Sequence, residues 1–202
     1  METENFRDKY EKSGILGQTL IRNFYRSVGI MIHRTRLSGG RVLEVGVGEG
    51  YSTTYLRPLL PGTIDYHASE IETVLLSRAK NRNHGIQHVQ ESVYQLARKT
   101  ACYDLVICLE VLEHLTEPER ALKELCRVSQ GFVIISVPRE PIWRALNMMR
   151  GKYLSDWGNT PGHIQHWSSD GIEKFAGRYA TVKAVRRPLP WTVLLLETTR
   201  QS

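Results

Sequence analysis

The most informative stretch of this chain is a short apolar run followed by three glycines at alternate positions. Residues 41–52 read RVLEVGVGEGYS. Val42, Leu43 and Val45 predict a buried strand that runs directly into the glycines, and a helix is predicted from about Ser52 to Leu60. Glycine permits a sharp turn after a strand and lets a ligand lie against bare backbone, because it has no Cβ and tolerates positive φ. The stretch therefore predicts a ligand-binding strand, loop and helix.

The residues around the glycines narrow the choice of ligand. A Walker loop requires a lysine after its last glycine, but Gly50 is followed by Tyr51 and Ser52. A dinucleotide fingerprint places its third glycine three positions after the second, and Tyr51 occupies that position. Glu44 lies in the apolar strand two residues before Gly46, where an ionised carboxylate is costly unless a nearby group compensates it. A cationic ligand would do so, and a glycine turn with a purely structural buried acid is the alternative.

Two runs of residues carry a resemblance to a known family. EVGVGEG, at 44–50, closely resembles the first motif of the class I methyltransferases, whose cofactor S-adenosylmethionine carries an ammonium and a sulfonium group. DLVICLEVLEHL, at 104–115, resembles the small-molecule group of that family, which includes the quinone-biosynthesis enzymes. The resemblance implies a Rossmann-like fold and S-adenosylmethionine as the cofactor.

Acidic residues after the next two predicted strands complete the expected cofactor site. Glu70 follows a strand at 63–69, where a carboxylate can accept hydrogen bonds from ribose hydroxyls; Glu72 is its rival, and a charge at a helix N-terminus is the alternative role. The resemblance places Glu91, where the family more often has Asp, against the adenine amino group. Glu110, after the fourth strand, is expected near the methionine end of the cofactor and the acceptor. The expected cofactor residues are Glu44, Gly46, Gly48, Gly50, Glu70, Ile71, Glu91, Ser92, Val93 and Glu110.

Strands alternate with helices from residue 41 to 137, which predicts right-handed crossovers and a doubly wound parallel sheet. The last two strand-like runs, at 181–187 and 191–197, are joined by only three residues, too few for a parallel crossover. They should therefore pair as an antiparallel hairpin. The expected fold is α/β, with a mostly parallel seven-stranded sheet and a C-terminal antiparallel hairpin.

The segments outside this alternating core are expected to build the acceptor side. Residues 1–40 predict an amphipathic helix with an arginine-bearing face, and the resemblance makes this segment a lid in which Tyr10 and Tyr25 are candidates. Residues 41–202 form the cofactor-binding domain. An insertion at about 138–179, which contains three of the four tryptophans, is expected to cover the acceptor and to make it partly apolar or aromatic.

Composition limits the class of protein. The 202 residues are 41% hydrophobic, enough for one substantial core. Charged side chains are frequent in residues 1–12 and no apolar run approaches a membrane span, so we expect a soluble cytoplasmic protein. Three cysteines without a C-x-x-C pair indicate neither disulfides nor zinc. A net charge of +6 is compatible with an anionic acceptor, RNA or peripheral membrane contact.

The expected activity is transfer of a methyl group from S-adenosylmethionine to a small molecule such as a phenol, a sugar or a natural-product intermediate. His163, His166 and Glu110 are the candidate catalytic bases if the acceptor is a hydroxyl, and His114 is either a base or a structural hydrogen-bond partner. The spacing of His163 and His166 gives two ligands without a matching carboxylate, so no metal is expected. The alternatives are an RNA methyltransferase, which would usually show an N/D-P-P-Y/F motif that this chain lacks, and an inactive cofactor-binding regulatory subunit.

Overall fold

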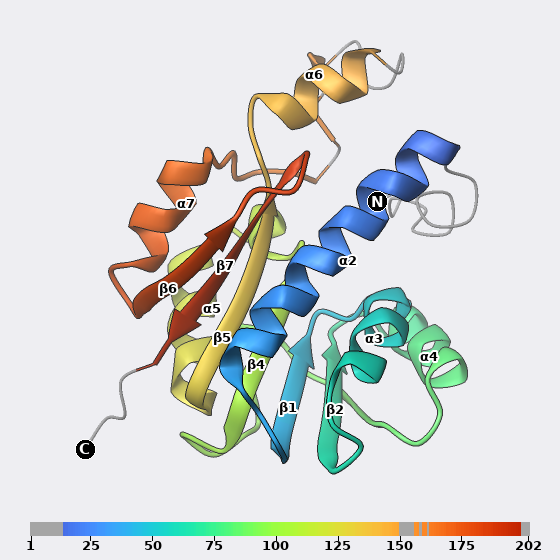
Figure 1. Cartoon of the computed structure of the whole chain (residues 1–202), viewed down its shortest axis with the longest axis vertical. Helices are drawn as coiled ribbons and strands as arrows, with labels where there is room; N and C mark the ends of the chain where they lie inside the picture. The colour runs from blue at the N-terminus through green and yellow to red at the C-terminus, as the bar shows by residue number, and fades with distance from the viewer. Residues whose placement is uncertain (1–13, 150–155, 158, 161, 199–202) are drawn as a thin grey trace.

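The computed structural model describes residues 14–149, 156–157, 159–160 and 162–198. Over these residues seven strands form one sheet in the order β3-β2-β1-β4-β5-β7-β6 (Figure 1). The strands are β1 Gly40–Val45, β2 Ile64–Glu70, β3 Gln87–Gln90, β4 Tyr103–Leu109, β5 Ser129–Pro138, β6 Thr181–Arg186 and β7 Trp191–Glu197. The sequence predicted each of these strands.

Strand direction confirms the predicted architecture. The strands β3, β2, β1, β4 and β5 are parallel to their neighbours. Strand β7 runs antiparallel to both β5 and β6, so the last two strands form the expected hairpin. Because parallel strands all end on the same side, the carboxyl ends of β1, β2 and β4 meet at one edge of the sheet.

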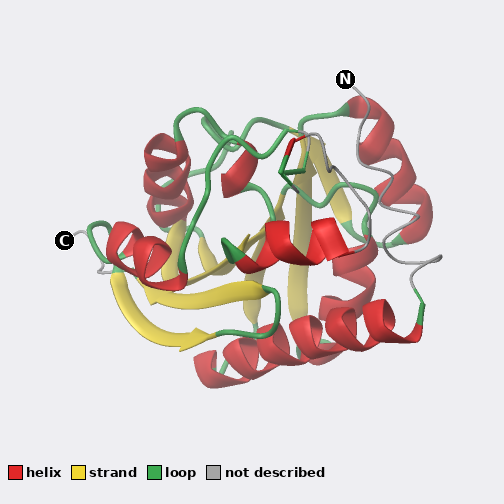
Figure 2. Ribbon diagram, turned by 90° about the horizontal axis from the view of Figure 1, so that it is seen from above, coloured by secondary structure: helices red, strands yellow, loops and turns green. Residues whose placement is uncertain are grey.

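Helices cover both faces of the sheet (Figures 1 and 2). Helix α2 precedes β1, helix α3 connects β1 to β2, and helix α4 connects β2 to β3. Helices α5 and α7 contribute to the core on the face of the sheet opposite to α2. The described helices are α2 Ile15–Thr35, α3 Tyr51–Leu56, α4 Thr73–Arg82, α5 Pro118–Val128, α6 Ile142–Met149 and α7 Ser169–Ala176, with 3-10 turns η1 Arg57–Leu59 and η2 Leu112–His114. None of them is both long enough and apolar enough to cross a membrane.

The first crossover differs from the sequence prediction in one respect. A single helix was expected from about residue 52 to 60, but the structure has α3 followed by the 3-10 turn η1. Pro58 lies in the first turn of η1. Because proline has no backbone N–H and its ring clashes with the preceding turn, it cannot continue an α-helix. The residue pattern around it remains helical in periodicity, which is why the prediction extended too far.

Alternate residues of the central strands enter the two cores. On one face Leu105 and Ile134 pack with Met31 of α2, and on the other Val106 and Ile135 pack with α5. All of these side chains are fully buried. Strands covered on both faces favour apolar side chains at successive positions, which explains the long apolar runs of β4 and β5 in the sequence.

Helix α2 is a layer of the core. Its predicted amphipathic pattern is confirmed, because Phe24 and Met31 are buried while Arg22 and Arg26 are exposed. Tyr25 is buried and stacks on Tyr55 of α3, with 4.3 Å between the ring centroids. The segment before α2, including Tyr10, lies outside the described residues, so a lid at the start of the chain stays a prediction.

We predict that Met31→Ala will lower the free energy of unfolding by about 2 to 5 kcal/mol, because it removes a fully buried side chain and leaves a cavity. Leu16→Ala on the same helix is the matched control. Leu16 is 74% exposed, so its loss should change the stability by less than about 0.5 kcal/mol. Urea denaturation of both variants measures the difference. Equal effects would show that α2 is not a layer of the core.

Candidate functional site

The glycine loop after β1 turns sharply and is fastened to β2. The amides of Gly46 and Val47 both donate to the carbonyl of Ser69, at 2.8 and 3.1 Å. Gly46 has φ of +74°, and a Cβ at this position would lie 2.4 Å from Cγ2 of Val111. A side chain at position 46 would strain the backbone and would clash with Val111, which lies two residues after β4. This position therefore requires glycine.

Gly50 closes the loop at the start of α3. It has φ of +81°, and a Cβ would lie 2.5 Å from the side-chain nitrogen of Asn83. The same nitrogen donates to the Gly50 carbonyl at 2.7 Å, which joins the loop to the end of α4. The sequence therefore predicted the position of the turn correctly, and the structure adds the packing that makes its first and last glycines necessary.

Glu44 is buried beneath the loop, and hydroxyl groups of neighbouring side chains compensate its carboxylate. Thr53 Oγ1 and Tyr66 Oη donate to Glu44 Oε2 at 2.6 and 2.7 Å. Burial raises the pKa of Glu44 above its usual 4.5, while hydrogen bonds from Ser52, Thr53 and Tyr66 oppose that rise. The pKa of Tyr66 lies well above its usual 10, mainly because of burial, so its hydroxyl remains a donor. These hydrogen bonds compensate the buried carboxylate of Glu44 without a cationic ligand. Contact of Glu44 with the cofactor ammonium therefore stays a prediction.

Glu70 joins the ends of β1 and β2. Its Oε2 accepts a hydrogen bond from the amide of Gly48 at 2.8 Å. Its Oε1 accepts from the amides of Ile71 and Glu72, at 2.8 and 3.1 Å. A carboxylate offers about four lone-pair sites, so Oε2 retains the capacity to accept one more hydrogen bond. The exposed side chain of Ile71 lies beside it.

Glu91 has a partner that the sequence did not indicate. Its Oε1 pairs with Arg98 at 3.2 Å, and its Oε2 accepts from the amide of Ala97 at 3.1 Å. The side chain of Val93 is packed in the core, and Ser92 Oγ accepts from the amide of Tyr94. An adenine contact in this segment would therefore involve backbone groups or a carboxylate already bound to Arg98, and it stays a prediction.

Glu110 follows β4 at the centre of the sheet and contacts two other strands. Ser136 Oγ of β5 donates to Glu110 Oε1 at 2.7 Å, and Trp191 Nε1 of β7 donates to Oε2 at 2.5 Å. Its φ of +57° is uncommon for a residue with a side chain. Such conformations cluster at binding and catalytic sites. Because Ser136 and Trp191 both donate to it, the carboxylate of Glu110 is held in place as a hydrogen-bond acceptor.

The two histidines of the 161–168 segment have different surroundings. His163 is buried, and its ring packs against Trp143 and His114, with centroids 5.9 and 4.9 Å away. The Nε2 of His166 is 3.0 Å from Asn159 Oδ1, a hydrogen bond at the exposed surface. Of the two, only His163 joins a set of close metal-ligating side chains, together with Glu113 and His114.

Several residues of this site escaped the sequence analysis. Thr53 and Tyr66 compensate Glu44, Arg98 pairs with Glu91, and Trp191 contacts Glu110. The proximity of Glu113 to His163 was also unforeseen. The adjacent Glu113 and His114, followed later by a histidine-containing segment, are the only signal that could have suggested that group.

Comparison with known proteins places the chain among methyltransferases. Residues 43–135 match the family model described as a methyltransferase domain. The ubiquinone biosynthesis O-methyltransferase of Rickettsia akari is 30% identical over 77% of this chain and 64% of its own length. That of Rickettsia canadensis is 30% identical over 68% of this chain and 59% of its own length. The curated relatives that match are longer proteins, of which the chain spans between 33% and 65%.

Solved structures share the fold. Magnesium protoporphyrin IX methyltransferase from Synechocystis PCC 6803, crystallised with S-adenosylhomocysteine (SAH), has a TM-score of 0.69 at 18% identity and covers 95% of this chain and 91% of its own. The PH0226 protein from Pyrococcus horikoshii has a TM-score of 0.71 at 15% identity over 98% of this chain and all of its own. At these identities the likeness is one of fold.

We predict that the stability difference between Glu44→Gln and the wild type will depend on pH. Because burial raises the pKa of Glu44, the folded state binds its proton more tightly than the unfolded state, and wild-type stability falls as pH rises from about 4.5 to the raised pKa. Glutamine does not titrate. The advantage of the variant should therefore grow across this window, by at most about 1.4 kcal/mol per pH unit. Urea denaturation between pH 4 and 8 measures it, and a difference independent of pH would contradict the assignment.

Proposed function

We propose that the chain, which matches methyltransferases in sequence and class I methyltransferases in fold, transfers the methyl group of S-adenosylmethionine to a small organic acceptor. The observation that carries the proposal is the carboxylate of Glu70, held by the Gly48 amide at the end of the sheet. The glycine loop and this carboxylate face the same edge, where open parallel sheets bind their ligands.

The residues at this edge fit the cofactor. The bare backbone of the glycine loop allows close approach of a ligand, and Oε2 of Glu70 can accept one ribose hydroxyl. A grip on both hydroxyls by the two oxygens, as the sequence suggested, would require Oε1 to exchange one of its two backbone amides. Ile71 offers an exposed apolar side chain next to it for the flat adenine ring. Bound there, S-adenosylmethionine supplies a methyl group already activated by the sulfonium.

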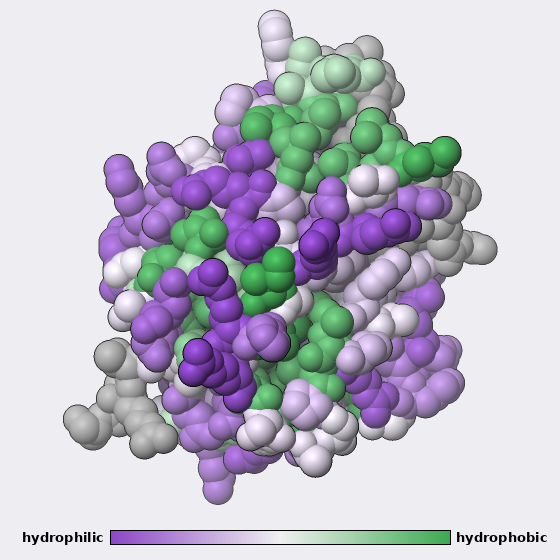
Figure 3. All heavy atoms as spheres, viewed as in Figure 1, coloured by the Kyte–Doolittle hydropathy of each residue, from purple (hydrophilic) through white to green (hydrophobic). Residues whose placement is uncertain are grey.

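Aromatic residues from three elements support an apolar acceptor. Trp191, whose indole binds Glu110, packs against Trp143 of α6 and Phe24 of α2, with centroid distances of 5.8 and 4.8 Å. Trp167, in contrast, packs against Phe175 in the core on the other face. Figure 3 shows hydrophobic residues gathered at the top of the molecule, over α6 and the first turn of α2. The exposed ones in these two elements are Ile15, Leu16, Met148 and Met149.

Methyl transfer is an in-line displacement, so the protein mainly has to align the acceptor with the methyl carbon and exclude water. Glu110, fixed by Ser136 and Trp191, is placed to accept a hydrogen bond from the acceptor. A hydroxyl acceptor also has to lose its proton, for which Glu110, His163 and His166 remain the candidate bases. An amine already free of its proton needs no base.

Two other functions remain alternatives to the proposal. RNA methylation is favoured only by the basic charge of the chain, +6, and by the exposed arginines of α2. An inactive regulatory subunit would retain the cofactor loop and lack turnover. All three functions use the same cofactor, so the acceptor and the turnover distinguish them.

We predict that Glu70→Ala will weaken binding of SAH by roughly 5- to 150-fold, the equivalent of about 1 to 3 kcal/mol for a charged hydrogen bond. Glu72→Ala is the matched control, because Glu72 is the neighbouring acid and its side chain does not cap α4. Isothermal titration calorimetry measures both affinities. Loss of affinity in Glu72→Ala alone would assign the ribose to Glu72, and no binding by the wild type would overturn the proposed cofactor.

We also predict that the protein binds bulk RNA weakly and consumes labelled S-adenosylmethionine in a metabolite extract. Filter binding at two salt concentrations measures the first property. Tight binding that weakens steeply with salt would favour an RNA substrate, because neutralised phosphates release counterions. Turnover in the extract measures the second property, and cofactor binding without turnover in either mixture would favour a regulatory subunit.

A further inference from the structure

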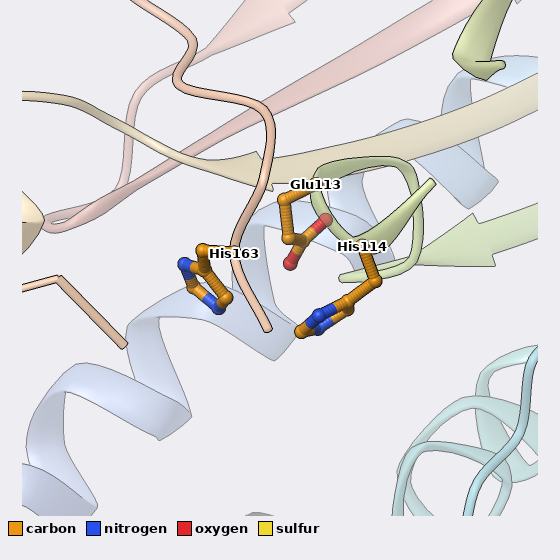
Figure 4. Close-up of side chains that lie close together, drawn as sticks. All are labelled: Glu113, His114 and His163. Carbon is orange, nitrogen blue, oxygen red and sulfur yellow. The ribbon is translucent and has the colours of Figure 1, made fainter. Parts of the chain in front are cut away.

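Three side chains that can bind metal ions converge beside the proposed acceptor region. Glu113, His114 and His163 each offer one ligand atom, and these atoms all lie within 4.8 Å of one another. Figure 4 shows the Glu113 carboxylate between the two imidazole rings, with Glu113 and His114 projecting from η2 and His163 from the facing segment. At this spacing, small side-chain rotations bring all three atoms within bonding distance of one ion.

The two segments are fastened together by their backbones. The amides of Ile164 and Gln165 both donate to the carbonyl of Glu113, at 2.9 and 3.0 Å. The side chain of Gln165 also donates to the carbonyl of Leu115 at 3.1 Å. The approach of His163 to Glu113 is therefore set by hydrogen bonds on both sides of the group. A preformed arrangement of this kind reduces the entropy lost when a ligand binds.

The orientation of His114 suits a metal ligand. Its Nδ1 is 3.0 Å from the carbonyl of Gly162. A carbonyl only accepts hydrogen bonds, so Nδ1 carries the proton and the neutral ring has its lone pair on Nε2. Metal-binding histidines usually donate their second ring N–H to a backbone carbonyl or a carboxylate, which fixes the tautomer and the direction of the ring.

We propose that Glu113, His114 and His163 bind a first-row divalent transition metal ion. Two imidazole nitrogens and one carboxylate oxygen suit zinc or its neighbours, whereas magnesium and calcium prefer oxygen ligands. Glu113 and His163 are 1% and 5% exposed, and His114 is exposed. The group is therefore closed on the protein side and open on the side of His114. Three protein ligands with an open position are typical of zinc sites that act on a bound molecule.

The alternative is a carboxylate paired with a protonated imidazole. Such a pair needs only one histidine, whereas here a second, exposed histidine is held in the group by Gly162. A pair would bind no ion in solution and would tolerate loss of His114. Metal binding that requires all three side chains separates the two explanations.

If the proposed function holds, the open position selects an acceptor that carries a hydroxyl. A bound cation lowers the pKa of a coordinated hydroxyl, so its proton can pass to solvent water without a histidine base. The resulting oxygen anion forms the new bond to the methyl carbon as the carbon–sulfur bond breaks. Its electron pair stays on sulfur and gives SAH. His163 is then a metal ligand, and the proton does not pass through it.

The test is a titration of the metal-free full chain with Co²⁺, followed by visible absorption, and with Zn²⁺, followed by calorimetry. The wild type should bind one ion. His114→Ala should weaken binding by at least about tenfold, and because His114 is exposed this variant should fold normally. Glu113→Gln and His163→Ala should do the same, with circular dichroism as the check on folding. His166→Ala, which removes the neighbouring histidine of the segment, should keep wild-type metal affinity.

Equal affinity of the wild type and His114→Ala, or an equal loss in His166→Ala, would overturn the metal site. SAH binding, measured separately, keeps this result distinct from failure of the proposed function. Binding of SAH with no binding of metal would reject only the metal. Binding of metal without binding of SAH would reject the proposed function and leave the site intact.

Discussion

The hydrogen bond from the Gly48 amide to the Glu70 carboxylate is the contact on which the rest of the site depends. It spans the ends of two parallel strands and fixes the glycine loop against the acid that ends β2. The other oxygen of Glu70 is held by the backbone at the start of the next helix. One carboxylate thus determines where a ligand can lie along the loop and keeps one acceptor position facing it.

The proposed cofactor side and the proposed acceptor side of the site are built by different means. The cofactor side uses backbone groups at the ends of β1 and β2, whose positions follow from strand pairing. The acceptor side uses side chains from β4, β5, β7 and the segment before α7. Glu110 contacts β5 and β7, whereas Glu113, one turn later, meets His114 and His163. A conformation with positive φ at Glu110 separates these two acids, which point to different partners.

Buried acids recur in this protein, and three of them show different sources of compensation. Glu44 accepts hydrogen bonds from two hydroxyls, and Glu70 accepts from three backbone amides. Glu91 pairs with Arg98. Burial without such partners would cost several kcal/mol for each charge. A divalent cation at Glu113, as proposed, would extend the same principle to a fourth carboxylate by supplying the positive charge from outside the chain.

The sequence by itself determined the order of strands and helices along the chain, the glycine turn, the acid at the end of β2 and the terminal hairpin. These features depend on local periodicity, on glycine conformation and on the length of a connection, and neighbouring residues encode all three. Only the tertiary structure decided the partners of the buried acids. Trp191 reaches Glu110 from 81 residues away, and Gly162 meets His114 across 48 residues. Residue patterns specify which face of an element is buried, but the side chains that meet there depend on how distant elements pack, so the group of Glu113 and the two histidines was visible only in the fold.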